Sequence, residues 1–122
     1  MDKMESTEST QYMVEQFERG IINDYIQMDR FGVYMDDSGC IYLSDMYVKE
    51  MYRGQGVGGE VMVRLCEFAD INGLDIRCLP CSDDDGSGDE RLMRFYGRYG
   101  FEVVCEYGGC VVEMVRKVKK FK

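Results

Sequence analysis

A glycine-rich run in the middle of the chain constrains the fold most. Arg53-Gly54-Gln55-Gly56-Val57-Gly58-Gly59 lies between an apolar, strand-like segment and a strongly helical one. Glycine lets a backbone approach a ligand closely, and the first N–H groups of a helix have no acceptor within that helix. Those groups and the helix dipole favour an anion, most often a phosphate. The run therefore predicts a strand, a tight turn and a helix that together hold a phosphate group.

Strand-like and helix-like segments alternate around this run. Asp36-Asp37-Ser38-Gly39 has hairpin-turn chemistry and separates expected strands at Phe31–Met35 and Cys40–Val48. Val57–Asn72 carries its apolar residues on one helical face, and Gly73 is well placed to end that helix. The remaining expected elements are a helical segment over Ser9–Met28 divided at Gly20, a strand at Leu74–Leu79, a helix at about Glu90–Tyr99 capped by Ser87 or Asp89, and strands at Phe101–Glu106 and Cys110–Val118 joined around Gly108-Gly109.

This order of elements places one strand–helix–strand crossover between two hairpins. It predicts an α/β (α+β) fold with a mixed, mostly antiparallel sheet and helices on both faces. At 122 residues the chain is expected to form a single domain over 1–122, with a helical N-terminal part at 1–30 and a core at 31–118.

Charge and composition narrow the possible functions. A net charge of -8 argues against nucleic-acid binding and suits a cationic partner such as an amine. The chain has no apolar run long enough to span a bilayer, and its acidic N-terminus does not resemble a signal peptide, so a cytoplasmic protein with reduced cysteines is expected. With no histidine, nucleophile systems that need a histidine base are excluded.

Three kinds of phosphate-binding turn can be compared with the glycine run. A P-loop needs Lys-Ser/Thr after its glycines, but Glu60 follows Gly59. A dinucleotide-binding turn matches Gly54, Gly56 and Gly59 by spacing, yet Lys49–Arg53 separate the strand from the glycines and the chain has no second half-sheet. The pattern that remains begins with an arginine, whose guanidinium adds a charged fork suited to a pyrophosphate.

Two motifs carry a resemblance to a known family. Val48-Lys49-Glu50-Met51-Tyr52-Arg53-Gly54-Gln55-Gly56-Val57-Gly58 resembles motif A of the Gcn5-related N-acetyltransferases (GNAT), and the segment from Asp89 to Phe101, containing Phe95-Tyr96 and Gly100-Phe101, resembles their motif B. The motifs occur in the family's order, and the resemblance covers roughly 31–118. The short chain and its acidic loop are also similar to small acetyltransferases encoded by bacteriophages, including an anti-CRISPR acetyltransferase that modifies a lysine of a host protein.

The resemblance implies a splayed sheet that binds acetyl-CoA between the strands Cys40–Val48 and Leu74–Leu79. It implies that Tyr96 donates a proton to the leaving thiolate. The alternative interpretation of Tyr96 is a core aromatic residue. An amine also needs a proton acceptor, for which Asp45, Ser44 and Glu50 are candidates. The implied cofactor-binding residues are Met46, Val48, Arg53, Gly54, Gln55, Gly56, Val57, Gly58, Gly59, Tyr96 and Asp89, the last standing where the family commonly has asparagine.

The function so implied is direct transfer of acetyl from acetyl-CoA to a primary amine, either a protein lysine or a small molecule. A non-catalytic protein of the same fold that binds a host protein is the alternative. No metal, nucleic-acid or membrane partner is expected; a zinc site at Cys78, Cys81, Cys105 and Cys110 has poor spacing. Dimers are common in the resembled family, and a phage-encoded protein would act in the host cytoplasm.

Overall fold

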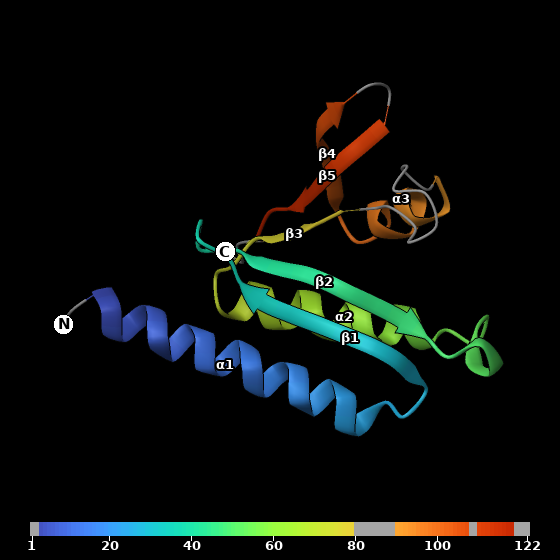
Figure 1. The fold of residues 1–122 in the computed structure, drawn as a ribbon, viewed down its shortest axis with the longest axis horizontal. Helices are drawn as coiled ribbons and strands as arrows, with labels where there is room; N and C mark the ends of the chain where they lie inside the picture. The colour runs from blue at the N-terminus through green and yellow to red at the C-terminus, as the bar shows by residue number, and fades with distance from the viewer. Residues whose placement is uncertain (1–2, 80–89, 108–109, 119–122) are drawn as a thin grey trace.

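A computed structural model describes residues 3–79, 90–107 and 110–118 of the chain (Figure 1). Both expected hairpins, the long central helix and the helix before the second hairpin are present. The elements are α1 (Lys3–Asp24), β1 (Met28–Met35), β2 (Ile41–Val48), a short 3-10 segment η1 (Glu50–Tyr52), α2 (Val57–Ile71), β3 (Ile76–Cys78), α3 (Glu90–Gly97), β4 (Phe101–Tyr107) and β5 (Cys110–Arg116). The expected turn at 108–109 and the expected caps at 87 and 89 lie outside the described residues.

The five strands form one mixed sheet in the order β1-β2-β3-β5-β4. Only β2 and β3 run parallel, and α2 connects them, while the other neighbouring pairs are antiparallel. The sheet is open rather than closed into a barrel. The predicted fold class, a single domain with one crossover between two hairpins, is confirmed.

The joint between β2 and β3 is short. Pairing is limited to Ile41–Leu43 on β2 and Ile76–Cys78 on β3, although β2 continues to Val48. Figure 1 shows the two strands diverging beyond this joint. The predicted splay of the sheet is therefore present, and among the residues that the structure describes no strand pairs with this edge of β2 from Ser44 onward.

The core lies between α2 and one face of the sheet. Phe17 of α1 stacks on Phe68 of α2 with ring centroids 4.5 Å apart, so α1 joins this side while running along the edge of β1. Tyr96 of α3 packs against Phe101, which faces the same side because it pairs with the buried Arg116. The three described helices therefore pack around one face of the sheet, rather than being divided between both faces as expected.

The helix α1 is continuous, so the predicted division at Gly20 is wrong. A glycine inside a helix costs about 1 kcal/mol relative to alanine. On either side of Gly20, Val14 and Ile21 are fully buried, and each such burial contributes roughly 1.5–3 kcal/mol. Burial of the apolar face outweighs the local cost, and the helix continues.

The strand β3 is shorter than predicted because the end of α2 extends into the connecting turn. Gly73 adopts φ +68°, and the N–H of Leu74 donates to the carbonyl of Ala69 at 2.8 Å. Gly73 thus ends the helix as expected, through a left-handed residue. Leu74 remains part of that helix-terminating turn, so the strand begins at Ile76.

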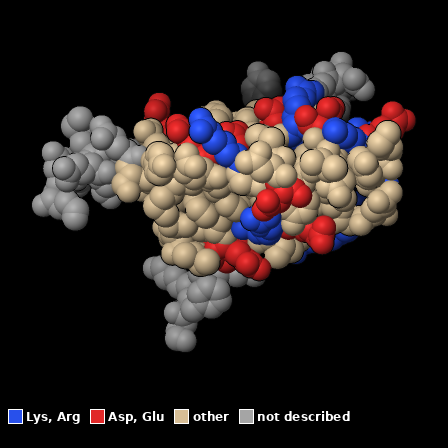
Figure 2. Space-filling model, turned by 90° about the horizontal axis from the view of Figure 1, so that it is seen from below, with Lys and Arg blue, Asp and Glu red and all other residues tan. Residues whose placement is uncertain are grey.

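The surface beside α1 carries a mixture of charges. Figure 2 shows this side of the molecule, where acidic and basic side chains are interspersed among uncharged ones and the described residues form no continuous basic area. Across the described ranges, no helix is both long enough and apolar enough to cross a membrane.

Candidate functional site

The glycine run forms a tight turn between η1 and α2. Gly54 and Gly56 have φ values of +80° and +83°, a conformation that side-chain-bearing residues rarely adopt. Gly56 immediately precedes α2, and the N–H of Glu60 donates to its carbonyl at 3.0 Å, closing the first helical turn. The N–H groups of the three residues between them therefore point out of the helix end. This is the strand, turn and helix that the sequence predicts.

A cavity of about 240 Å³ lies beside this turn. Its walls combine main-chain atoms of the glycine run with apolar side chains of β2 and α3. A Cβ placed on Gly58 would lie 3.6 Å from Val48 Cγ2 and 3.7 Å from Phe95 Cζ, so the missing side chain keeps this part of the cavity open. The lining residues are Val48, Tyr52, Arg53, Gly54, Gly56, Val57, Gly58, Gly59 and Phe95.

Arg53 connects the glycine turn to the open edge of β2. Its Nε donates to the carbonyl oxygen of Val48 at 3.0 Å. The N–H of Lys49, in the same peptide group, donates to Gln27 beside β1. Because a trans peptide directs its C=O and N–H in opposite directions, the Val48 carbonyl faces away from β1. The end of β2 thus presents main-chain atoms toward the cavity side, where β3 no longer pairs with it.

Tyr96 lies in the hydrophobic core, with only 7% of its surface exposed. Its ring packs against Phe101 at 5.3 Å and edge-on against Phe95 at 5.6 Å between centroids. Phe95, which belongs to the motif B resemblance but was given no role there, lines the cavity instead. The structure thus places Tyr96 where its core-aromatic reading expects it.

The candidate proton acceptors do not lie together. Glu50 belongs to the exposed segment η1, where its carbonyl accepts from the N–H of Arg53. Asp45 and Ser44 lie on β2 and line a different cavity of about 370 Å³, which also reaches α1. Gln55 lies in the glycine turn, where its side-chain amide donates to Met51 O at 3.4 Å. Asp89 lies outside the described residues.

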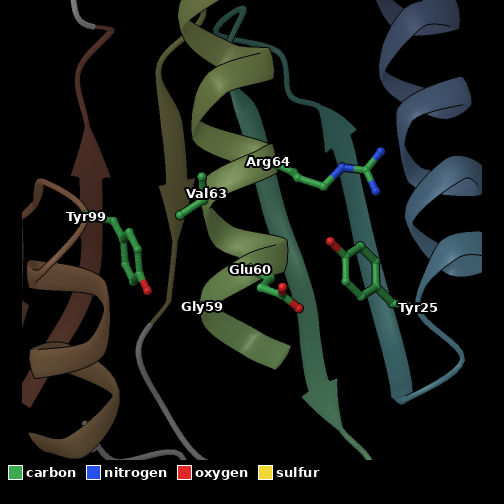
Figure 3. Close-up of a pocket in the computed structure, with 6 residues that line it drawn as sticks. All are labelled: Tyr25, Gly59, Glu60, Val63, Arg64 and Tyr99. Carbon is green, nitrogen blue, oxygen red and sulfur yellow. The ribbon is translucent and has the colours of Figure 1, made fainter. Parts of the chain in front are cut away.

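A third cavity, of about 460 Å³, crosses the outer side of α2 between Tyr25 and Tyr99 (Figure 3). Arg64 lies over the Tyr25 ring, with its guanidinium carbon 5.5 Å from the centroid. On the other side, the Tyr99 hydroxyl lies 2.9 Å from the position of a Cβ on Gly59. Gly59 therefore permits close contact between α2 and the end of α3. The spacing of Phe95 and Tyr99, one helical turn apart, is the sequence signal that could have identified them as a pair.

A buried ion pair holds this arrangement together. Arg116 of β5 makes two bonds to the carboxylate of Asp70 on α2, at 2.8 and 2.9 Å, and its Nε donates to Tyr99 O at 2.8 Å. The bond to Asp70 raises the pKa of Arg116, and so the guanidinium stays charged. The pair fixes α2 against β5 and the turn after α3, and therefore helps to position both sides of the glycine cavity.

Cys78 is a buried thiol rather than an available metal ligand. Burial, with a contribution from nearby Glu113, raises its pKa to about 12. Metal binding needs a thiolate, so this value disfavours coordination at neutral pH. Cys81 lies outside the described residues, and the described ranges contain no group of three or more side chains arranged to hold a metal ion.

Comparison with protein families identifies the cavity-bearing domain. The family described as "Acetyltransferase (GNAT) domain" matches residues 9–103, which include the glycine turn, the cavity and α3. This chain belongs to the GNAT acetyltransferase family. The resemblance noted from its two motifs is thereby confirmed.

Individual relatives agree with membership of the GNAT family. The chain is 35% identical over 69 residues to a thialysine N-epsilon-acetyltransferase from Bos taurus, covering 57% of this chain and 38% of that protein. The chain thus spans little more than a third of the length of this curated relative.

Solved structures share the GNAT fold at low sequence identity. The anti-CRISPR protein AcrVA5 is 21% identical with a TM-score of 0.55, over 70% of this chain and 85% of that one. Ard1 from Thermoplasma volcanium is 22% identical with a TM-score of 0.56, over 74% and 62%. A PaiA N-acetyltransferase from Thermoplasma acidophilum, solved in complex with coenzyme A, is 17% identical with a TM-score of 0.54, over 71% and 51%.

Proposed function

We propose that this GNAT protein is an acetyl-CoA-dependent N-acetyltransferase that transfers acetyl directly to a primary amine. The observation that carries the proposal is the glycine cavity at the N-terminus of α2, placed beside the open edge of β2. A structural neighbour from Thermoplasma acidophilum was solved with coenzyme A, which supports this cofactor class.

The residues around the cavity fit coenzyme A. The N–H groups of Val57, Gly58 and Gly59 suit a pyrophosphate, because helix N-termini stabilise anions. Arg53 can add a charged fork once its guanidinium leaves the Val48 carbonyl. Phe95 supplies an apolar wall for an aliphatic arm. When bound, acetyl-CoA supplies an activated thioester.

Residues of β2 are suited to orient the acyl group. In a regular strand, alternate residues direct their main-chain groups to the same edge. The carbonyl of Val48 faces the open edge, so we expect Met46, two residues earlier, to do so as well. A main-chain N–H fixed there would stabilise negative charge on the acyl oxygen without reorganisation.

The reaction forms one C–N bond and breaks the thioester C–S bond. The amine nitrogen must lose a proton and the departing sulfur must gain one. Asp45 and Glu50 are our candidates for accepting the first, and Tyr96 for donating the second. A protein lysine and a small-molecule amine both satisfy this scheme.

The burial of Tyr96 favours a second candidate function. Tyr96 is only 7% exposed and its ring packs against Phe101, so we expect its hydroxyl to need a local opening to reach a thiolate. A protein that keeps the glycine cavity but lacks a working proton donor would act by binding a partner protein, with coenzyme A as a structural ligand.

Calorimetry and thiol release distinguish these functions. We expect the purified protein to bind coenzyme A and to transfer acetyl to amines, and Tyr96→Phe to lower turnover about 100-fold with little change in affinity. Tyr12→Phe, on the exposed face of α1, is the matched control. Absence of coenzyme A binding would refute both functions. Binding with equally negligible transfer by wild type and Tyr96→Phe would support the partner-binding protein.

A further inference from the structure

The 370 Å³ cavity between α1, β1 and β2 is lined by both charged and apolar side chains. Glu18, Asp29 and Asp45 supply three carboxylates, while Ile22, Met28 and Phe31 supply aliphatic and aromatic surface. Building on the proposed acetyltransferase function, we propose that this cavity is the acceptor site. It takes a lysine-like arm, meaning an aliphatic chain that ends in a primary ammonium group.

Gly32 opens this cavity across β1. A Cβ at that position would lie 2.7 Å from Ser44 Oγ and 3.1 Å from Asp45 Oδ2. The sheet register shifts between Gly32 and Val33, where Ser44 is the extra residue on β2. Because Gly32 has no side chain, polar groups of β2 reach over β1 toward α1. A side chain at position 32 would occupy the space that Ser44 Oγ and Asp45 Oδ2 now fill, and would separate them from the cavity.

The charges in the cavity favour a cation. The lining residues carry three carboxylates and one guanidinium, that of Arg30, and the Glu18 carboxylate also accepts from the N–H of Val33 at 3.2 Å. Arg30 lies 3.9 Å from Asp45 Oδ1, and its guanidinium carbon also lies 4.7 Å from the centroid of the Tyr47 ring. Asp45 keeps 40% of its side chain exposed, so a ligand can reach it. An ammonium group placed among these carboxylates is attracted electrostatically and can donate up to three hydrogen bonds.

The acceptor cavity is also placed to serve a ligand bound in the 240 Å³ cavity beside the glycine turn. Met46 faces α2, since its Cε lies 4.0 Å from the position of a Cβ on Gly58. The adjacent residue, Asp45, faces the opposite side of the sheet, as neighbouring strand residues do. Both lie on the part of β2 that β3 does not pair with. An amine held beside Asp45 would therefore approach β2 from the face opposite to the one on which Met46 meets the glycine turn.

Asp45→Asn tests the proposal, with Asp37→Asn in the exposed hairpin turn as a control for loss of one negative charge. The probe is Nα-acetyl-lysine amide, with acetyl-CoA as donor. We expect Asp45→Asn to raise the KM for the probe about tenfold, because a charge-assisted contact is lost. Calorimetric binding of the probe without acetyl-CoA should weaken in parallel, while the Kd for coenzyme A stays unchanged.

Gly32→Ala gives an independent check, because the new methyl displaces Ser44 Oγ and Asp45 Oδ2 without altering charge. It should raise the same KM, and the wild-type KM should rise with salt as the attraction is screened. A lower KM for a lysine-containing peptide than for Nα-acetyl-lysine amide would identify a protein as the source of the arm. A higher KM for the peptide would identify a small molecule.

Failure of this proposal differs from failure of the proposed function. Acetyl transfer in which Asp45→Asn and Asp37→Asn both keep the wild-type KM within twofold would place the acceptor elsewhere and leave the acetyltransferase intact. Absence of coenzyme A binding by wild type would instead remove the proposed function first.

Discussion

Replacing Gly58 with alanine should stabilise the protein and weaken its binding of coenzyme A. Gly58 is the second residue of α2 and does not have a positive φ. A new Cβ would make ordinary contacts with Val48, Phe95 and Met46 at 3.6, 3.7 and 4.0 Å. Alanine in place of glycine in a helix gains about 0.5–1 kcal/mol. The same methyl enters the wall of the 240 Å³ cavity, where overpacking against a ligand should cost about tenfold or more in affinity.

Gly56→Ala provides the matched comparison, because Gly56 has a positive φ and Gly58 does not. Gly56 has φ +83°, and an L-residue in that conformation costs about 1–2 kcal/mol. No atom lies within 4 Å of a Cβ there, so the cost is conformational rather than steric. Two glycines separated by one residue are thus expected to shift stability in opposite directions.

Urea unfolding measures both effects. With an m-value of about 2 kcal/mol/M, the midpoint should rise by about 0.3–0.5 M for Gly58→Ala and fall by about 0.5–1 M for Gly56→Ala. Calorimetry with coenzyme A then reports the affinity of each variant. Equal destabilisation by the two substitutions, or undiminished affinity in Gly58→Ala, would contradict the geometry assigned to the turn.

Two further predictions concern stability. Asp70→Asn should lower the free energy of unfolding by about 3–5 kcal/mol, because the buried Arg116 charge loses its counter-ion, whereas Asp24→Asn in an exposed ion pair should lower it by about 0–1 kcal/mol. Thermal unfolding of both variants checks the contrast. Burial alone would raise the pKa of Asp36, but hydrogen bonds from Ser38 and Cys40, with the Arg77 charge, lower it below its usual range. Its stabilisation is therefore present above pH about 4 and lost as the pH falls through the folded-state pKa, so the unfolding free energies of wild type and Asp36→Asn should differ constantly between pH 5 and 7 and converge in acid.

Local chemistry made much of the fold predictable. The turn at 36–39, the tight turn that contains Gly54 and Gly56, and the stop at Gly73 each depend on residues close together in sequence. These features were confirmed because the hydrogen bonds that form them join residues only a few positions apart. Gly20 shows the opposite case, since burial of α1 along its length overrode a local preference for a break.

Features that join distant segments could not be read in the same way. Asp70 and Arg116 are 46 residues apart, and nothing in their local sequence signals that they pair. The acceptor cavity requires α1 to lie along β1 and Gly32 to lie beneath Ser44, both consequences of tertiary packing. Tyr96 was identified by resemblance, yet its depth in the core depends on how α3 rests on β4.

The short joint between β2 and β3 has a mechanical consequence. Within the described parts of the sheet, the two hairpins are connected only through the pairs between 41–43 and 76–78. Each hairpin is internally stiff, because its strands pair along most of their length. Bending at the joint would therefore change the width of the gap beside Ser44–Val48 without breaking hydrogen bonds inside either hairpin. The Asp70–Arg116 ion pair lies at this joint, because Arg116 pairs with Ile76, so it holds α2 to the second hairpin at the point where bending would occur.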